Sequence, residues 1–181
     1  MTTIIIIAVI AVIALWLVGA QRKLVSADEL CKNAMSQIGV QQNSRWDALT
    51  ALADLIKSYN EHEYKTIMDV IAQRTAVGRN SSAAEAAEQE AKISEALKQI
   101  NVVVEQYPEL KANDMYMRTM DSVNTYENQV RMSRMTYNDT VTKLNRMVRQ
   151  FPDNIAASIF GFKEKDYLAE PQGKTEMPSM R

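Results

Sequence analysis

A long amphipathic stretch of the sequence covers residues 111–150 and reads KANDMYMRTMDSVNTYENQVRMSRMTYNDTVTKLNRMVRQ. Within it, apolar and small side chains recur at intervals of three, four and seven residues, which places them on one face of an α-helix. Pro152 follows closely and predicts the end of this helix. We therefore expect a helix over residues 111–150 with one buried face. That face comprises Tyr116, Thr119, Val123, Val130, Tyr137, Val141, Leu144 and Val148.

A second amphipathic pattern lies earlier in the chain, from about Ser26 to residue 70. Ser26 can cap this helix, and Glu29 three residues on completes a capping box. Alternatively, the helix runs on without a break from the residues before it. Gly39 is a mild weak point inside the helix. Its buried face is predicted to comprise Ala34, Ile38, Ala48, Leu52, Ile56, Tyr59, Ile67 and Val70.

A third helix is expected between these two, from about Ser82 to Gln106, because Pro108 ends the pattern. A turn over residues 77–82 should separate it from the preceding helix, since Gly78 is followed there by residues that cap helices. Its buried face is predicted to comprise Ile93, Leu97, Ile100, Val104 and Tyr107.

Three long helices joined by short connections bury their apolar faces by folding back antiparallel. A short fourth helix is expected over residues 153–160, ended by Gly161. The region beyond it holds two of the four prolines in the chain. The sequence therefore predicts an all-α fold, with an antiparallel bundle of three long helices and one short helix over residues 22–162. A flexible C-terminal tail is expected over residues 163–181.

An apolar run precedes the bundle: residues 4–18 read IIIIAVIAVIALWLV, and no charged side chain appears before Arg22. A helix over residues 2–20 extends roughly 28 Å at about 1.5 Å per residue, close to the ~30 Å of a bilayer core. Trp16 lies near one end, where an indole prefers the membrane interface. We therefore expect a transmembrane anchor over residues 1–21, which contacts membrane lipid through residues 2–20.

The alternative to an anchor is a signal peptide cleaved after Val18-Gly19-Ala20, which offers small residues. The segment before the apolar run, Met1-Thr2-Thr3, lacks the basic side chains of a signal peptide, and this favours an uncleaved anchor. The nearest cations, Arg22, Lys23 and Lys32, all follow the run. Because positive charge is retained inside, we expect a single-pass protein of the cell membrane with its N-terminus outside and its helical domain cytoplasmic.

Several short passages resemble the LemA family in residues and in order: Tyr107-Pro108-Glu109-Leu110-Lys111-Ala112-Asn113, Tyr126-Glu127-Asn128, Tyr137-Asn138, Phe151-Pro152 and Phe160-Gly161-Phe162. The resemblance covers about residues 30–162. It implies an N-terminal membrane helix and a cytoplasmic helical bundle, and it implies no established activity. The chain departs from the family at Gly39, where an acidic residue is usual, and at residues 49–54, which lack the usual proline.

No catalytic pattern is found in the sequence. His62-Glu63-Tyr64-Lys65-Thr66 places Thr66 where a zinc-binding helix needs its second histidine, and the chain has one histidine and one cysteine. With 21 basic and 22 acidic residues, the chain has no basic surplus for nucleic acid. We expect no enzyme activity, no metal or other cofactor, and no nucleic-acid partner.

Polar side chains fall on or near the predicted buried faces of two helices. Such groups are costly to bury unless they are partnered. One interpretation is a structural ladder that fixes helix register, and the other is a pocket for a ligand in the bundle. A cavity beside Glu127 and Arg134 would favour the pocket, and tight pairing the ladder. The residues concerned are Arg45, Asp47, His62, Arg74, Glu127, Arg134, Asn138 and Asn145.

Six of the eleven methionines lie within residues 111–150, and Met117, Met132 and Met135 fall off the predicted buried face. Flexible thioethers suit adaptable partner surfaces, although these three could instead pack under another helix. We therefore expect a non-enzymatic scaffold or adaptor that presents its bundle to other membrane proteins or to a second copy of the chain. The alternative is a sensor that binds a small molecule or lipid in the polar pocket.

Overall fold

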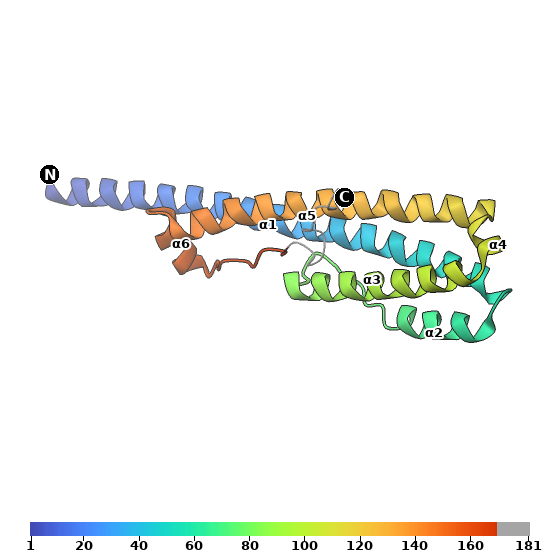
Figure 1. Cartoon of the computed structure of the whole chain (residues 1–181). Helices are drawn as coiled ribbons and strands as arrows, with labels where there is room; N and C mark the ends of the chain where they lie inside the picture. Colours follow the sequence, from blue (N-terminus) through green and yellow to red (C-terminus); the bar gives the residue numbers. More distant parts are fainter. Residues whose placement is uncertain (170–181) are drawn as a thin grey trace, which may run out of the picture.

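The structure, a computed structural model, describes residues 1–169, and in this part of the chain every regular element is an α-helix (Figure 1). The all-α fold, with a long N-terminal apolar helix followed by a helical bundle, is as predicted. The six helices are α1 (Thr2–Lys57), α2 (Glu61–Ile71), α3 (Ala83–Gln106), α4 (Pro108–Lys111), α5 (Asp114–Arg149) and α6 (Asp153–Phe160).

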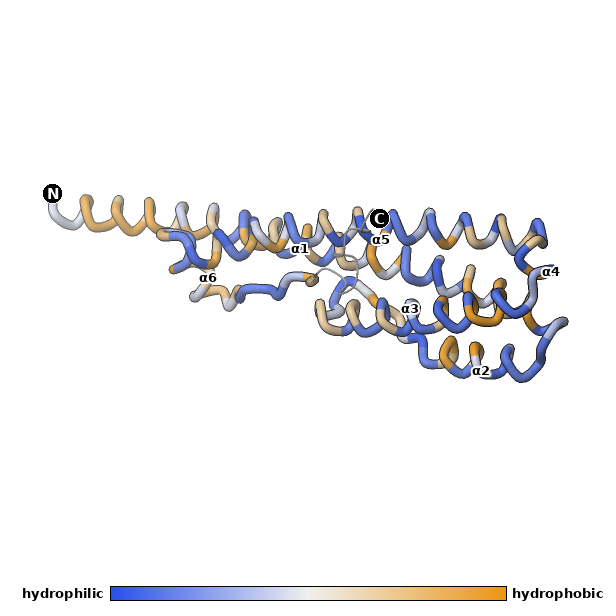
Figure 2. Tube along the Cα trace, in the orientation of Figure 1, coloured by the Kyte–Doolittle hydropathy of each residue, from blue (hydrophilic) through white to orange (hydrophobic). Residues whose placement is uncertain are grey.

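Helix α1 is one continuous helix of 56 residues, so the apolar run and the first helix of the bundle form a single rod. It contains a window of mean hydropathy 2.9, long enough to cross a membrane, of which only 6% is buried in the protein. A core helix of a soluble protein would bury most of such a window. Figure 2 shows this apolar end projecting beyond the other helices. Of the two predicted starts for the first bundle helix, the uninterrupted one is therefore observed.

The predicted helix through residue 70 is wrong at one place, because the chain turns back after Lys57. Asn60, in extended backbone, begins α2: its side-chain oxygen accepts hydrogen bonds from the backbone N–H groups of His62 and Glu63, at 3.0 and 3.2 Å. An asparagine in this position satisfies donors that the first turn of a helix leaves free. The apolar spacing continues across the turn, and for this reason periodicity alone did not reveal it.

Helix α1 is the centre of the arrangement (Figure 1). It packs antiparallel against α5 over most of the length of α5, while α2 and α3 cover its distal half and α6 folds back beside its apolar end. Two apolar clusters result. The proximal cluster is centred on Leu24, Met35, Ile38, Tyr137, Val141 and Leu144. The distal cluster is centred on Trp46, Leu52, Ile56, Ile67, Ile93, Ile100 and Val123.

Gly39 is a point of close contact rather than a mild weakness in the helix. The connection between α2 and α3 crosses α1 at this residue, and a Cβ built on Gly39 would lie 1.8 Å from the carbonyl oxygen of Val77. Val77 itself is buried in the proximal cluster. The absence of a side chain at residue 39 therefore lets the connection lie on the helix surface.

Replacing Gly39 by alanine should destabilise the protein by about 1–3 kcal/mol, because overpacking against backbone outweighs the ~1 kcal/mol that alanine gains in helix propensity. The measurement is the thermal unfolding midpoint of the full-length protein in detergent, by circular dichroism. Gly78→Ala is the matched control, since its added Cβ meets no atom within 4 Å. Equal midpoints for the two variants would contradict the close contact.

Candidate functional site

The polar residues predicted to form one seam are divided by the structure among four places, of which the segment held by Arg134, Asn138 and Asn145 is described below. Arg45 and Glu127 come together beside α3. Asp47 and Arg74 form an exposed ion pair with 3.4 Å between the guanidinium and the carboxylate, away from the apolar clusters. His62 lies exposed in the first turn of α2, where its backbone N–H bonds Asn60. Asp47, His62 and Arg74 therefore do not join Glu127, because the turn at residues 58–60 redirects the chain that carries two of them.

Arg45 is the most deeply buried charged side chain among the described residues, with 2% of its surface exposed. Its Nη1 donates to Oε1 of Glu90 on α3 at 2.5 Å. One turn away, Gln42 Nε2 donates to the carbonyl oxygen of Ala86 at 3.0 Å. A buried charge is tolerated when it is paired and hydrogen-bonded. These contacts fix the register of α3 along α1.

The partner Glu90 was absent from the sequence prediction. It lies three residues before Ile93, at the edge of the buried face of α3, so a search of that helix for acids near its stripe would have found it.

The same ion pair lines an open groove of about 440 Å³ along the side of α3 that borders α1 and α5. Glu127 of α5 closes one side of this groove, so Arg45, Glu90 and Glu127 approach one cavity from three helices. The remaining lining residues mix apolar and polar groups: Ser94, Leu97, Lys98, Asn101, Val102 and Glu105. A cavity beside Glu127 and a tight ion pair thus coexist here. Arg134, which was expected at the same place, is elsewhere.

Asn138 and Asn145 hold an extended segment against α5. Asn145 donates from Nδ2 to the carbonyl oxygen of Lys165 and accepts from its N–H, both at 2.9 Å. Asn138 makes the same two bonds, also at 2.9 Å, to the backbone of Leu168. Seven residues of helix advance roughly 10.5 Å, and three residues of extended chain advance about 10 Å. The two spacings match, so both asparagines bind the segment at once.

Further contacts complete this segment, which we call the C-terminal strap (residues 163–169). Leu168 is buried in the proximal cluster. Lys165 Nζ lies 3.0 Å from a carboxylate oxygen of Asp28 on α1, and Arg134 donates to the carbonyl oxygen of Ala169. The flexible tail predicted from residue 163 is therefore wrong for residues 163–169, and the rest of it, residues 170–181, lies outside the described residues. The strap is not a helix, and the side-chain hydrogen bonds that hold it produce no periodic pattern in the sequence. For this reason the sequence did not predict it.

Two titratable groups next to the strap have shifted pKa values. Partial burial raises the pKa of Asp28, but hydrogen bonds from Lys32 and Lys165 lower it by more, so the pKa of this carboxyl lies below its usual value. Burial raises the pKa of Tyr137 to about 12. The phenol therefore stays protonated near neutral pH and donates to the carbonyl oxygen of Asp166 at 3.2 Å.

The three methionines proposed as a partner surface are exposed. Met117, Met132 and Met135 expose 46%, 60% and 58% of their surface. They lie on the side of α5 opposite its buried face, with no described helix covering them. The alternative, in which they pack under another helix, does not apply to the described part of the chain.

These features define a class of protein: a membrane-associated helical rod that begins in an apolar helix and continues into an antiparallel bundle. The sequence model of the LemA family matches residues 34–181. The chain belongs to the LemA family. The matched region extends past the resemblance at residues 30–162 and includes the C-terminal strap.

Several characterised proteins are similar to parts of the chain. Magnetosome protein MamQ 2 of Paramagnetospirillum magneticum is 36% identical over 81 residues, which are 44% of this chain and 30% of that protein. Magnetosome protein MamQ of Magnetospirillum gryphiswaldense is 32% identical over the same shares. Protein LemA of Metamycoplasma hominis is 23% identical over 141 residues, 77% of this chain and 64% of that protein. The chain thus spans under a third of the magnetosome relatives it matches.

Removing Glu90 should destabilise the protein by about 3–5 kcal/mol, because Glu90→Ala leaves the Arg45 charge buried without its partner. The thermal unfolding midpoint of the full-length protein in detergent measures this. Asp47→Ala, which breaks the exposed pair with Arg74, is the control and should change the free energy of unfolding by under about 1 kcal/mol. A similar small effect for both variants would show that Arg45 reaches solvent.

Replacing Asn145 by alanine should release the strap, because each lost hydrogen bond contributes about 0.5–1.5 kcal/mol and Asn145 makes two. Trypsin should then cut after Lys163 and Lys165 several-fold faster than in the wild type, as followed by mass spectrometry. Asn128→Ala, at an exposed position of the same helix, controls for any general effect on α5. If cleavage were equally slow in both variants, the asparagine contacts would not be what holds the strap.

Proposed function

We propose that this chain is a membrane-anchored, non-enzymatic scaffold that presents its helical rod to other membrane proteins. The exposed methionine surface of α5, formed by Met117, Met132 and Met135, is the observation that carries the proposal. Arg22 and Lys23 directly after the apolar run support a cytoplasmic position for the rod, by the retention of positive charge inside.

A scaffold has to hold its binding surface at a defined position, and the helices supply this. Helix α1 passes from the apolar run into the bundle without a break. Helix α5, which carries the methionines, packs along α1 over most of its length. The surface from Met117 to Met135 covers 18 residues of a single helix, or roughly 27 Å. The distance of this surface from the membrane is therefore set by two packed helices and not by a linker.

The chemistry of the surface favours a protein partner. Thioether side chains are flexible and polarisable, so they adapt to apolar side chains of differing shape. Exposed polar residues, among them Asn124 and Asn128, lie between Met117 and Met132. Isolated apolar contacts with a polar surround are typical of interfaces that assemble and separate. The partner expected is an apolar patch on the cytoplasmic part of a membrane protein, or on a second copy of this chain.

The test is to purify the tagged full-length protein from its own membranes in mild detergent after chemical crosslinking. A discrete partner or oligomer should accompany the wild type. In the triple variant Met117→Gln, Met132→Gln, Met135→Gln, the amount of partner recovered should fall by roughly an order of magnitude or more. The reason is that removing each interface anchor costs above about 1 kcal/mol of binding free energy.

The matched control is Ala84→Gln, Ala87→Gln, Ala91→Gln, which changes three exposed positions of α3, outside the methionine surface, and should retain the partner. Equal retention by both triple variants would move the interface away from the methionines. A strictly monomeric wild type that retrieves no partner would contradict the scaffold.

The groove beside Glu127 favours one alternative, a sensor for a small molecule or lipid. Three glutamates, Glu90, Glu105 and Glu127, line the groove against two cations, Arg45 and Lys98, and leave an excess of one negative charge, while Leu97 and Val102 offer apolar surface. A ligand for such a site combines a cationic group with an apolar part. The monomeric outcome above, together with a ligand whose stabilising effect is lost in Glu127→Gln, would favour the sensor.

A further inference from the structure

Helix α6 exposes a stripe of large apolar side chains on the side that faces away from the bundle. Phe151, just before the helix, exposes 76% of its surface, and Ile155 and Ile159 expose 46% and 61%. Ile155 and Ile159 are four residues apart in α6, so they lie along one side of the helix, and Phe151 lies just before its first turn. Ala156 and Ala157, on the other side, are buried in the proximal cluster. A stripe of this kind normally faces an apolar surrounding.

The place of α6 identifies that surrounding. Helix α6 packs against α1 beside the end of its apolar run (Figure 1). Trp16 and Leu17, from within the run, pack against the same cluster as Ala156 and Ala157. If residues 2–20 cross the bilayer, α6 lies at the depth of Trp16, where the acyl chains meet the headgroups. The stripe is thus continuous with the lipid-facing surface of α1.

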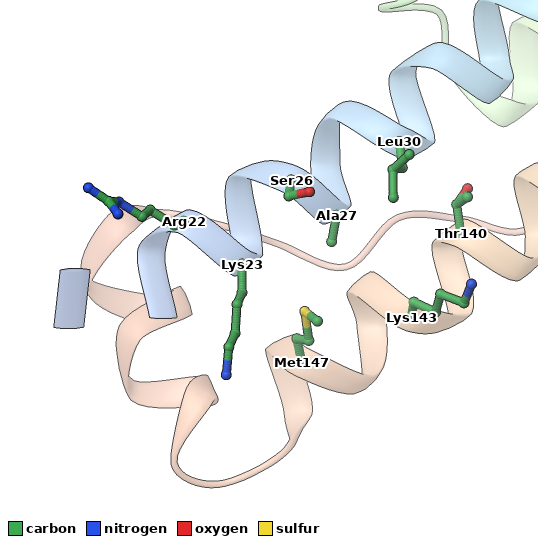
Figure 3. Close-up of a pocket in the computed structure, with 8 residues that line it drawn as sticks. All are labelled: Arg22, Lys23, Ser26, Ala27, Leu30, Thr140, Lys143 and Met147. Atoms are coloured by element: carbon green, nitrogen blue, oxygen red, sulfur yellow. The ribbon is translucent and has the colours of Figure 1, made fainter. Parts of the chain in front are cut away.

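A basic groove begins directly after the apolar run, at Arg22 and Lys23 (Figure 3). It lies between α1 and α5 and has a volume of about 370 Å³. Figure 3 shows Lys23 and Lys143 at opposite ends of the groove, with Met147 between them and Arg22 directed outward. Ser26 and Thr140 add hydroxyl groups, and no acidic residue lines the groove.

The cations of this groove are not neutralised within the described part of the chain. The ion pairs nearby use other residues: Asp28 with Lys32 and Lys165, and Glu164 with Arg149. Lys23 and Lys143 thus offer positive charge and hydroxyl neighbours to an anion. Located directly beyond the apolar run, the groove lies at the level of lipid phosphates.

We propose that the juxtamembrane end of the rod is a second membrane contact that selects anionic phospholipid. The stripe Phe151, Ile155 and Ile159 inserts among the acyl chains, and the groove with Lys23 and Lys143 binds the phosphate of an anionic headgroup. Two observations identify the bilayer as the occupant: continuity with the apolar surface of α1, and the charge of the adjoining groove. An amphipathic helix supported by nearby cations binds anionic membranes in this way.

This contact has a mechanical consequence. A single spanning helix is free to tilt and rotate in the bilayer. A helix fixed to its side and lying in the interface restrains both motions, so the outer side of α5 would face a defined direction along the membrane. The inference depends on the membrane association of α1 and not on the scaffold role, so either can fail without the other.

The first test measures the depth of α6 in the full-length protein. A Cys31→Ala background with Ser158→Cys places an environment-sensitive fluorophore next to the stripe and leaves the stripe intact. In vesicles of phosphatidylglycerol and phosphatidylcholine brominated near the headgroup, emission at residue 158 should fall at least two-fold. The same fluorophore at Lys65→Cys on distal helix α2 should be unaffected. Ile155→Asn with Ile159→Asn should abolish the quenching at residue 158.

Equal emission at residues 158 and 65 in these vesicles would overturn the insertion of α6. The insertion of α6 would also be overturned if the fluorophore at residue 158 were already fully buried in detergent, before lipid is added. That result would indicate that a second copy of the chain covers the stripe. Because Ile155 and Ile159 are exposed, their substitution should leave the thermal unfolding midpoint in detergent unchanged.

The second test measures lipid selection. The full-length protein is reconstituted with equal amounts of the two lipids, and the phosphatidylglycerol retained on extraction is determined by mass spectrometry. Neutralising Lys23 and Lys143 with glutamine should lower the retained phosphatidylglycerol about five-fold for each cation removed. Lys111→Gln with Arg131→Gln, two exposed cations far from the apolar run, should have no effect. Equal lipid retention by both double variants would overturn the headgroup site.

Discussion

The packing of α5 along the continuous helix α1 is the interaction on which the rest of the molecule depends. Helix α1 belongs at once to the apolar run, the proximal cluster and the distal cluster. In proteins most helical stability comes from the packing of an amphipathic face and not from intrinsic helix propensity. Helix α5 supplies that packing, and α2, α3 and α6 then add to a surface that already exists. Loss of the α1–α5 contact would therefore separate both clusters together.

Apolar packing brings the helices together, and hydrogen bonds from polar side chains to defined partners then fix their relative positions. Arg45 fixes α3 to α1 through Glu90, while Asn138 and Asn145 fix the strap to α5. Apolar contacts are non-directional and tolerate sliding by a turn, whereas a paired hydrogen bond is lost after such a slip. The polar residues near the buried faces thus act chiefly on register. Arg45 pairs with Glu90 and not with the polar residues of α5, and the groove beside Glu127 does not include Arg134, so the choice between a structural ladder and a ligand pocket stays a prediction.

The parts predicted well from the sequence are those where one helix buries one face between clear end signals. The helices expected over residues 82–106, 111–150 and 153–160 correspond closely to α3, α5 and α6. The turn at Asn60 was missed because Ile56 and Ile67 keep helical spacing across it. Glu90 and the strap were missed for a related reason: contacts between distant segments depend on the fold and leave no local pattern. Periodicity reports which face is buried, but not which residue lies opposite.

Side chains that fix the register of the helices make internal contacts, so the surfaces that we propose for binding lie on the outside of the bundle. Side chains near the buried faces, such as Arg45 and Asn145, are committed to internal contacts, and the described residues contain no group of metal-binding side chains. What remains available is the outer surface: the methionines of α5, the groove on α3, and the juxtamembrane end around α6. All three are held at defined positions along α1. If the chain acts as the scaffold that we propose, with α1 in the membrane, each of these surfaces would lie at its own height above the bilayer, so partners would be selected by their distance from the membrane.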